Sequence, residues 1–125
     1  MRILTVGDIV ASDGREFIYN NLGRIKKKYG ADYCVANGEN AATTNGITVD
    51  IADTLLSCGV DVITLGNHTF ANKEYKAVLG DNPRVIRPIN YPPETEGMGY
   101  FVDDLGNVRI AVINAMGRVN MEPLD

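Results

Sequence analysis

Three short apolar stretches of this chain end in the same way, beside a glycine followed at once by polar side chains that can bind a metal ion. The stretches are residues 2–6, 33–36 and 62–65. The groups that follow them are Gly7-Asp8, Gly38-Glu39-Asn40 and Gly66-Asn67-His68. Runs of β-branched and other apolar residues are typical of buried strands, which do not continue through carboxylates, amides and imidazoles. The pattern therefore predicts three strands whose chemistry lies where each strand ends.

Two stretches between these strands have the apolar spacing of amphipathic helices. The first is predicted over residues 15–29, with Ser12 or Asp13 as a possible cap, and the second runs from a Thr48 N-cap to Gly59. Strand, helix, strand, helix, strand at these lengths predicts parallel βαβ units with right-handed crossovers. Because the first strand is apolar at successive positions, we expect helices to cover both of its faces.

Beyond the third strand the pattern is weaker. Residues 73–79 are compatible with a short helix, and residues 84–87 with a fourth strand that ends at a proline. Residues 99–102 and 108–114 flank a short polar loop and predict an antiparallel hairpin. The predicted fold is therefore α/β, with parallel βαβ units followed by a hairpin.

Composition and charge exclude several classes of protein. The 125 residues are 45% hydrophobic and 22% charged, which is typical of one globular domain. The net charge of -4 argues against a duplex nucleic-acid partner, and the lysines at 26–28 suit the last turn of a helix. No apolar run approaches the ~20 residues of a membrane span. We expect a soluble cytoplasmic protein in which Cys34 and Cys58 are reduced thiols.

The polar residues at the three strand ends are candidates for one shared site. In parallel α/β sheets the carboxyl ends of the strands open onto the same edge, where ligands bind. Each motif taken alone could be an ordinary turn, and only their recurrence favours a site. Oxygen ligands with few imidazoles suit manganese, iron, zinc or magnesium, and a carboxylate such as Glu39 can bridge two ions. Two such ions would clamp a phosphate and activate water. The candidates are Asp8, Glu39, Asn40, Asn67 and His68.

These groups resemble the first three metal motifs of the calcineurin-like metallophosphoesterases, and the Gly-Glu-Asn variant resembles the YmdB-type bacterial branch of that family. The resemblance extends over nearly the whole chain. Further matching stretches are residues 7–10, 14–15, 36–42, 46–48, 59–64, 87–92, 97–100 and 111–119.

The resemblance implies a four-layer α/β/β/α sandwich, of which residues 1–125 form the N-terminal part of a single domain. It also implies hydrolysis of phosphodiesters, with 2′,3′-cyclic nucleotides as the substrate class, at two divalent metal ions. By resemblance Asp8 would bind one metal, Glu39 would bridge the two and Asn67 would bind the second. Asn40 would lie at or next to a metal. His68 would face the substrate, where it would stabilise the phosphoryl group or protonate the leaving oxygen.

The chain also departs from the family pattern. Many members place a histidine two residues after the first aspartate, where this chain has Val10. Their later histidine ligands lie in a second half that this chain does not contain, and His68 is its only histidine. Nitrogen ligands would therefore have to come from elsewhere. We expect exposed apolar faces and a protein about twice this length, or a second chain that completes the domain.

Three functional hypotheses follow. The first is a metal-dependent phosphodiesterase that acts on a small phosphodiester or cyclic nucleotide and is inactive as an isolated 125-residue chain. The alternative is a catalytically silent metal- or nucleotide-binding regulatory module. The third is a structural or oligomerising domain, which could form a homo-oligomer. This hypothesis gives no reason for the recurrence of polar side chains at the strand ends.

Overall fold

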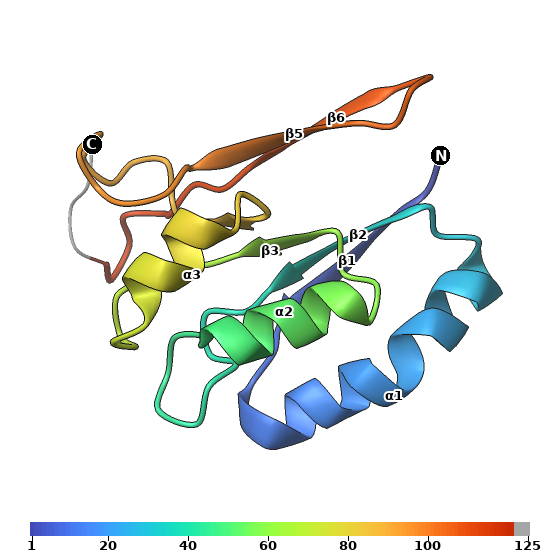
Figure 1. Cartoon of the computed structure of the whole chain (residues 1–125), viewed down its shortest axis with the longest axis horizontal. Helices are drawn as coiled ribbons and strands as arrows, with labels where there is room; N and C mark the ends of the chain where they lie inside the picture. Colours follow the sequence, from blue (N-terminus) through green and yellow to red (C-terminus); the bar gives the residue numbers. More distant parts are fainter. Residues whose placement is uncertain (122–125) are drawn as a thin grey trace.

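The computed structural model describes residues 1–121, which form a four-stranded parallel sheet, three helices and a separate two-stranded hairpin (Figure 1). The strands and helices alternate along the chain until the hairpin begins, as the sequence predicts. In chain order the elements are β1 (Ile3–Asp8), α1 (Ala11–Tyr29), β2 (Tyr33–Asn37), α2 (Val49–Ser57), β3 (Val62–Thr64), α3 (Tyr75–Asp81), β4 (Val85–Ile86), β5 (Tyr100–Asp104) and β6 (Arg109–Ile113).

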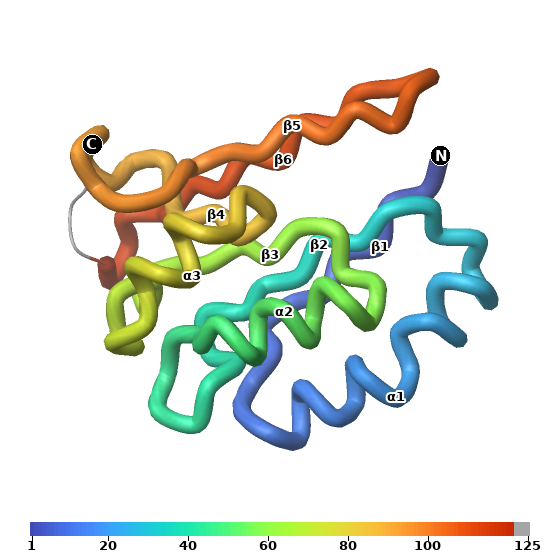
Figure 2. Tube along the Cα trace, in the orientation of Figure 1, coloured from blue at the N-terminus to red at the C-terminus, as the bar shows by residue number. Residues whose placement is uncertain are grey.

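The strands of the main sheet lie in the order β1-β2-β3-β4, and each pairs in parallel with the next. Each crossover thus advances by one strand in the same direction, so right-handed crossovers leave their helices on one face of the sheet. Hairpin β5–β6 lies on the side opposite α1 and α2 (Figure 1, Figure 2). The expectation that helices cover both faces of the first strand is therefore wrong, because the hairpin sheet, and not a layer of helices, lies on the second face of the main sheet.

Side-chain alternation divides the core into two clusters. Cys34, Ala36 and Ile63 point toward the helices and pack with Leu22 and Leu55. The alternate positions point toward the hairpin, and this second cluster contains Tyr33, Val62, Ile86 and Ile110, with Phe101 and Val112 packed against it. A parallel strand buried on both faces requires this continuous apolar sequence. Both cysteines are free thiols, as expected.

The start of α1 differs from the prediction. The helix begins at Ala11 rather than at residue 15, and its N-cap is Val10, which provides no side-chain hydrogen bond. Neither Ser12 nor Asp13 is the cap. Instead the Ala11 amide donates to the backbone oxygen of Asn40 at 2.9 Å. A backbone oxygen of the loop after β2 therefore accepts the hydrogen bond that the sequence pattern expects a polar capping side chain to accept.

Two other predicted helix ends are confirmed. The Thr48 hydroxyl oxygen accepts a hydrogen bond from the Ile51 amide at 3.3 Å and caps α2. Gly30 ends α1 with a φ of 60°, in the left-handed region that glycine adopts readily.

The hairpin is joined to the main sheet by polar side chains as well as by packing. The Asn114 amide donates to the backbone oxygens of Leu65, at 2.6 Å, and Ile86, at 3.1 Å. Asn114 therefore satisfies backbone groups at the ends of two strands of the main sheet. The second link is Asp103, which accepts from Tyr33 Oη at 3.0 Å and pairs with Arg84 at 2.7 Å. These contacts fix the hairpin across the sheet.

Apolar side chains remain exposed at the outer edge of both sheets. Ile3 on the edge strand β1 is 52% exposed, and on the hairpin Val102 is 50% and Ile113 is 66% exposed. This agrees with the expectation that the residues described here leave apolar faces uncovered. None of the helices within residues 1–121 combines the length and apolar character that crossing a bilayer requires.

Candidate functional site

The carboxyl ends of the first three strands lie level with one another. Asp8 is paired in register with Asn37, and Asn37 with Thr64, so the last residues of β1, β2 and β3 are neighbours. Backbone hydrogen bonds continue past the strand ends, from Ile9 to Asn37 at 3.0 Å and from Gly38 to Thr64 at 2.9 Å. The loops that carry the candidate side chains therefore start at one edge of the sheet.

Asn40 connects Asp8 to His68. Its Nδ2 donates to Asp8 Oδ1 at 3.0 Å and to Oδ2 at 2.9 Å, while its Oδ1 lies 2.5 Å from His68 Nδ1. An ionised carboxylate can only accept hydrogen bonds, so the NH₂ group of Asn40 must face Asp8 and its oxygen must face the imidazole. His68 Nδ1 therefore carries the proton of this contact. The other ring nitrogen, Nε2, is left for a different partner.

Glu39 is held beside His68 by neutral donors. Its Oε2 accepts from the His68 backbone amide at 3.1 Å, and its Oε1 accepts from Asn37 Nδ2 at 3.4 Å. Asn37 Oδ1 in turn accepts from the Glu39 amide at 3.2 Å. The Glu39 side chain is 17% exposed, so these contacts restrict a largely buried carboxylate whose position is set by β2 and by the loop after β3.

Gly66 makes room for that carboxylate. A Cβ atom at this position would lie 2.5 Å from Glu39 Oε1 and 2.6 Å from Glu39 Cδ, closer than real Cβ contacts allow. The turn that follows is closed by the Thr69 hydroxyl, which donates to the Gly66 oxygen at 2.6 Å, and by a backbone bond from Ala71 to His68 at 3.0 Å. The glycine thus permits a close approach of two loops.

Asn67 is the candidate that the structure does not bring into this hydrogen-bonded group. Its side chain is exposed and forms no hydrogen bond with any of residues 1–121. It lines a hollow of about 310 Å³ together with Phe70 and Tyr91. The structure thus joins Asp8, Glu39, Asn40 and His68 by direct contacts and leaves the Asn67 amide free to bind a further group.

The residues that meet at this edge fit a divalent cation. Within residues 1–121 neither Asp8 nor Glu39 forms an ion pair with lysine or arginine, and the Glu39–His68 pair is long, at 3.9 Å. Two carboxylates held by amides, without a balancing cation, are the oxygen ligands that hard and borderline divalent ions prefer. Over the same residues no cluster of three or more His, Cys, Asp or Glu side chains could hold an ion by itself. Residues 1–121 could therefore supply at most part of a ligand set.

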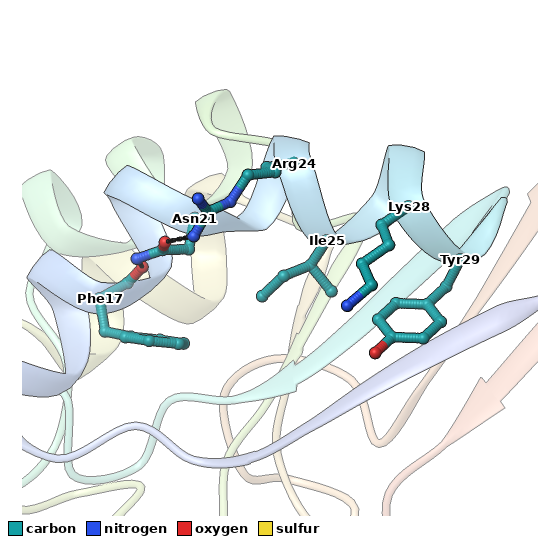
Figure 3. A pocket seen from close by; sticks show the side chains of 6 residues that line it. All are labelled: Phe17, Asn21, Arg24, Ile25, Lys28 and Tyr29. Atoms are coloured by element: carbon teal, nitrogen blue, oxygen red, sulfur yellow. Dashed lines mark hydrogen bonds between the residues drawn. The ribbon is translucent and has the colours of Figure 1, made fainter.

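A second hollow is chemically different. It has a volume of about 570 Å³ and lies along the later turns of α1, where Phe17, Ile25, Lys28 and Tyr29 extend from one side of the helix (Figure 3). Its lining contains no carboxylate and no histidine. This hollow therefore offers no metal site and is separate from the strand ends.

Several residues of the site were not identified from the sequence. Asn37 orients Glu39, but the sequence places it in the loop after residues 33–36 without a role, and the motif that contains Gly66 could be an ordinary turn. The position of Gly66 between a strand and a candidate ligand is a signal that another part of the chain approaches its backbone closely. Phe70 and Tyr91 lie in loops without periodicity, and no sequence pattern connects them.

The fold defines the class, an α/β metallophosphoesterase-like half. A solved structure of a hypothetical protein from Thermus thermophilus superposes with a TM-score of 0.90 at 39% identity, covering 100% of this chain and 48% of that chain. A solved phosphatase from Mycoplasma pneumoniae gives 0.87 at 30% identity, covering 98% and 45%.

The chain belongs to the family of YmdB-like proteins, whose family model matches residues 4–125. A relative in Bacillus subtilis (strain 168), the 2′,3′-cyclic-nucleotide 2′-phosphodiesterase, is 41% identical over 125 residues, which are 100% of this chain and 47% of the relative. The chain thus spans about half the length of the relatives that it matches. The family resemblance inferred from the sequence motifs is confirmed.

Proposed function

We propose that the protein containing this chain is a metal-dependent phosphodiesterase that hydrolyses 2′,3′-cyclic nucleotides. The observation that carries this proposal is the contact group at the strand ends, in which Asn40 joins Asp8 to His68 while Glu39 lies against the same histidine. The Bacillus subtilis relative, named for this activity, supports the substrate class, since it matches all of this chain.

Each of the candidate ligands has a distinct role in the proposal. Asp8 would hold one metal ion, Glu39 would hold both, and the Asn67 amide would hold the second. Asn40 would lie beside the first ion, and its oxygen would have to leave His68 Nδ1 in order to bind the metal itself. Two divalent ions, of iron, manganese, zinc or magnesium, would supply positive charge to the phosphodiester and raise the acidity of water. Residues outside this chain complete the ligand set.

His68 acts on the substrate through Nε2. Its Nδ1 is committed to the Asn40 oxygen, so Nε2 is the ring atom that can reach a phosphate or a leaving group. In its protonated form the imidazole donates the Nε2 proton to the ribose oxygen as a water oxygen bonds to phosphorus and the bond from the ribose oxygen to phosphorus breaks. The backbone contact with Glu39 and the side-chain contact with Asn40 orient the ring for this transfer.

Glu39→Gln in the complete protein that contains residues 1–125 tests the metal role. The amide keeps the size of the side chain and removes its charge, so metal content and turnover of a 2′,3′-cyclic nucleotide should fall together while the fold is retained. Glu94→Gln, at an exposed loop position, is the matched control and should change neither. Turnover that persists after the metal is lost would refute the proposed role of Glu39.

His68→Ala separates chemistry from metal binding. Metal content should stay near the wild-type value while turnover falls by roughly 10²–10⁴-fold, the usual contribution of a general acid or base. An equal loss of metal would make His68 a ligand instead. A protein that binds metal or nucleotide but turns over no phosphodiester would support the alternative, a catalytically silent regulatory module.

A further inference from the structure

A hollow of about 310 Å³ lies next to the candidate site. Its walls come from three segments that are distant in sequence, namely the loop after β3, the loop after β4 and the segment after β6. Asn67, which borders the hollow, directly precedes His68 in the chain. The residues that line it are Asn67, Phe70, Tyr91, Met116, Asn120 and Met121.

The aromatic part of the hollow is held rigid by edge-to-face packing. The Phe70 ring lies 5.2 Å from the Tyr75 ring with an interplanar angle of 87°, and 5.0 Å from the Tyr91 ring at 80°. This is the preferred geometry of aromatic pairs. Phe70 nevertheless remains 37% exposed, so a ring fixed by two neighbours still presents surface to a ligand.

The opposite wall is fixed by a reciprocal pair of hydrogen bonds. Asn90 Nδ2 donates to the Met116 oxygen at 3.0 Å, and the Met116 amide donates to Asn90 Oδ1 at 3.0 Å. This pair ties the residue next to Tyr91 to the segment after β6. The walls are therefore in place before a ligand arrives, as in most small-molecule sites.

We propose that this hollow binds the nucleobase of a nucleotide whose phosphate lies at His68 and the neighbouring carboxylates. The six lining residues include no charged side chain, so the hollow suits the neutral base rather than the phosphate. Aromatic rings stack on every base, and the Asn120 amide offers a donor and an acceptor, while Asn67, whose oxygen would bind the second metal ion, keeps only its NH₂ group for the base. The subsite accordingly favours nucleotides over other phosphodiesters without selecting one base. It rests on the proposed function, because the phosphate must lie at the strand ends.

The test compares two esters in the complete protein that contains residues 1–125. Adenosine 2′,3′-cyclic phosphate and 1-O-methylribose 2′,3′-cyclic phosphate share the reacting ring, but only the first has a base. Wild-type kcat/KM should be higher for the nucleotide by about ten- to a hundredfold, as expected for one stacked base. Phe70→Leu should lower this ratio about tenfold, through KM. Phe17→Leu, an exposed aromatic position on α1, is the matched control and should leave the ratio unchanged.

Equal kcat/KM values for the two esters in the wild type would overturn the base subsite, as would an equal loss on both esters in Phe70→Leu. If neither ester is hydrolysed the proposed function fails, and binding then decides the subsite. Adenosine 5′-monophosphate should bind at least about tenfold more tightly than ribose 5-phosphate, with the difference lost in Phe70→Leu. Equal affinities, or no binding of either, would refute it. Tyr91→Leu replaces Phe70→Leu if a thermal melt shows that the latter is unfolded.

Discussion

The amide of Asn40 decides which nitrogen of His68 carries a proton. It donates to both oxygens of Asp8, and this orientation turns its own oxygen toward His68 Nδ1. A carboxylate at the end of β1 therefore influences an imidazole after β3 although the two do not touch. At the scale of single residues, the site is a line of hydrogen bonds in which each member fixes the orientation of the next.

Gly66→Ala tests how closely Glu39 must approach the loop after β3. The added Cβ would lie 2.5 Å from Glu39 Oε1, so the carboxylate must move away from the His68 amide. A displacement of about 1 Å at a reacting centre can cost about a hundredfold in rate, and we expect turnover of a cyclic nucleotide to fall by that order.

The control for that substitution is Gly7→Ala, since Gly7 also precedes a candidate ligand but a Cβ there would meet no atom within 4 Å. It should retain most of the activity. Equal activity of the Gly66→Ala variant and the wild type would show that Glu39 tolerates displacement and would weaken its assignment as a bridging ligand.

At the scale of elements, removing the Thr48 hydroxyl and removing the Ser12 hydroxyl should have different effects on the free energy of unfolding. Thr48→Ala removes the hydroxyl that accepts from the Ile51 amide and should lower the free energy of unfolding by about 1 kcal/mol. Ser12→Ala should change it by less than about 0.5 kcal/mol, because α1 begins earlier and has no side-chain cap. Urea denaturation of both variants measures the difference, and a larger effect at Ser12 would contradict the observed start of α1.

The link between the two sheets responds to pH. Burial, reinforced by the hydrogen bond to Asp103, raises the pKa of Tyr33 from 10.0 to about 12. Because the folded pKa is the higher one, this group stabilises the fold fully below pH 10 and loses its contribution as the pH rises toward 12. Tyr33→Phe should lower stability at pH 7 by about 1 kcal/mol.

The same variant should lose less stability than the wild type between pH 10 and pH 12, because it has no phenol to ionise. Thermal melts across that range measure the difference. Parallel alkaline curves for the two proteins would show that Tyr33 is not held as described.

At the acid end, the hydrogen bond from Arg84 lowers the pKa of Asp103 below its usual 3.8. The stabilising contribution of Asp103 therefore disappears only as the pH falls below that value.

The sequence predicts the main elements and the group of strand-end residues because both depend on local patterns. Apolar runs bounded by glycine and polar side chains mark β1, β2 and β3, and parallel pairing then brings Asp8, Glu39 and His68 to one edge. The first turn of α1 could not be predicted, because it depends on a contact with the Asn40 backbone. Tertiary contacts of this kind override local capping preferences.

The hollow beside the site also could not be predicted from sequence patterns. Phe70 and Tyr91 belong to loops on either side of α3 and β4, and their rings meet only because the fold brings these two loops together. The hydrogen bonds of Asn90 with Met116 join segments that are 26 positions apart. Pattern analysis identifies which groups could do chemistry, whereas the enclosure around them arises from packing between distant segments.

At the scale of the whole molecule, the exposed apolar edge of the hairpin calls for a covering surface. Ile113 is 66% exposed within residues 1–121, and the relatives are about twice the length of this chain. If the rest of the protein or a second copy covers this face, Ile113→Asp in the complete protein should lower the free energy of unfolding by roughly 1.5–3 kcal/mol.

Asn107→Asp, at the exposed hairpin tip, adds the same charge without removing an apolar group and should have little effect. Chemical denaturation of both variants provides the comparison. If Ile113→Asp left the free energy of unfolding unchanged, this face would remain exposed to water in the complete protein.

The measurement that tests the central claim most directly is the ¹⁵N spectrum of the histidine ring in the metal-free complete protein, with the His68 signal identified by its loss in His68→Ala. We predict that neutral His68 is protonated at Nδ1, because Asp8 orients the Asn40 amide so that its oxygen faces that nitrogen. Asp8→Ala should weaken this preference. A His68 ring protonated at Nε2, unaffected by Asp8→Ala, would contradict the linked site at the three strand ends.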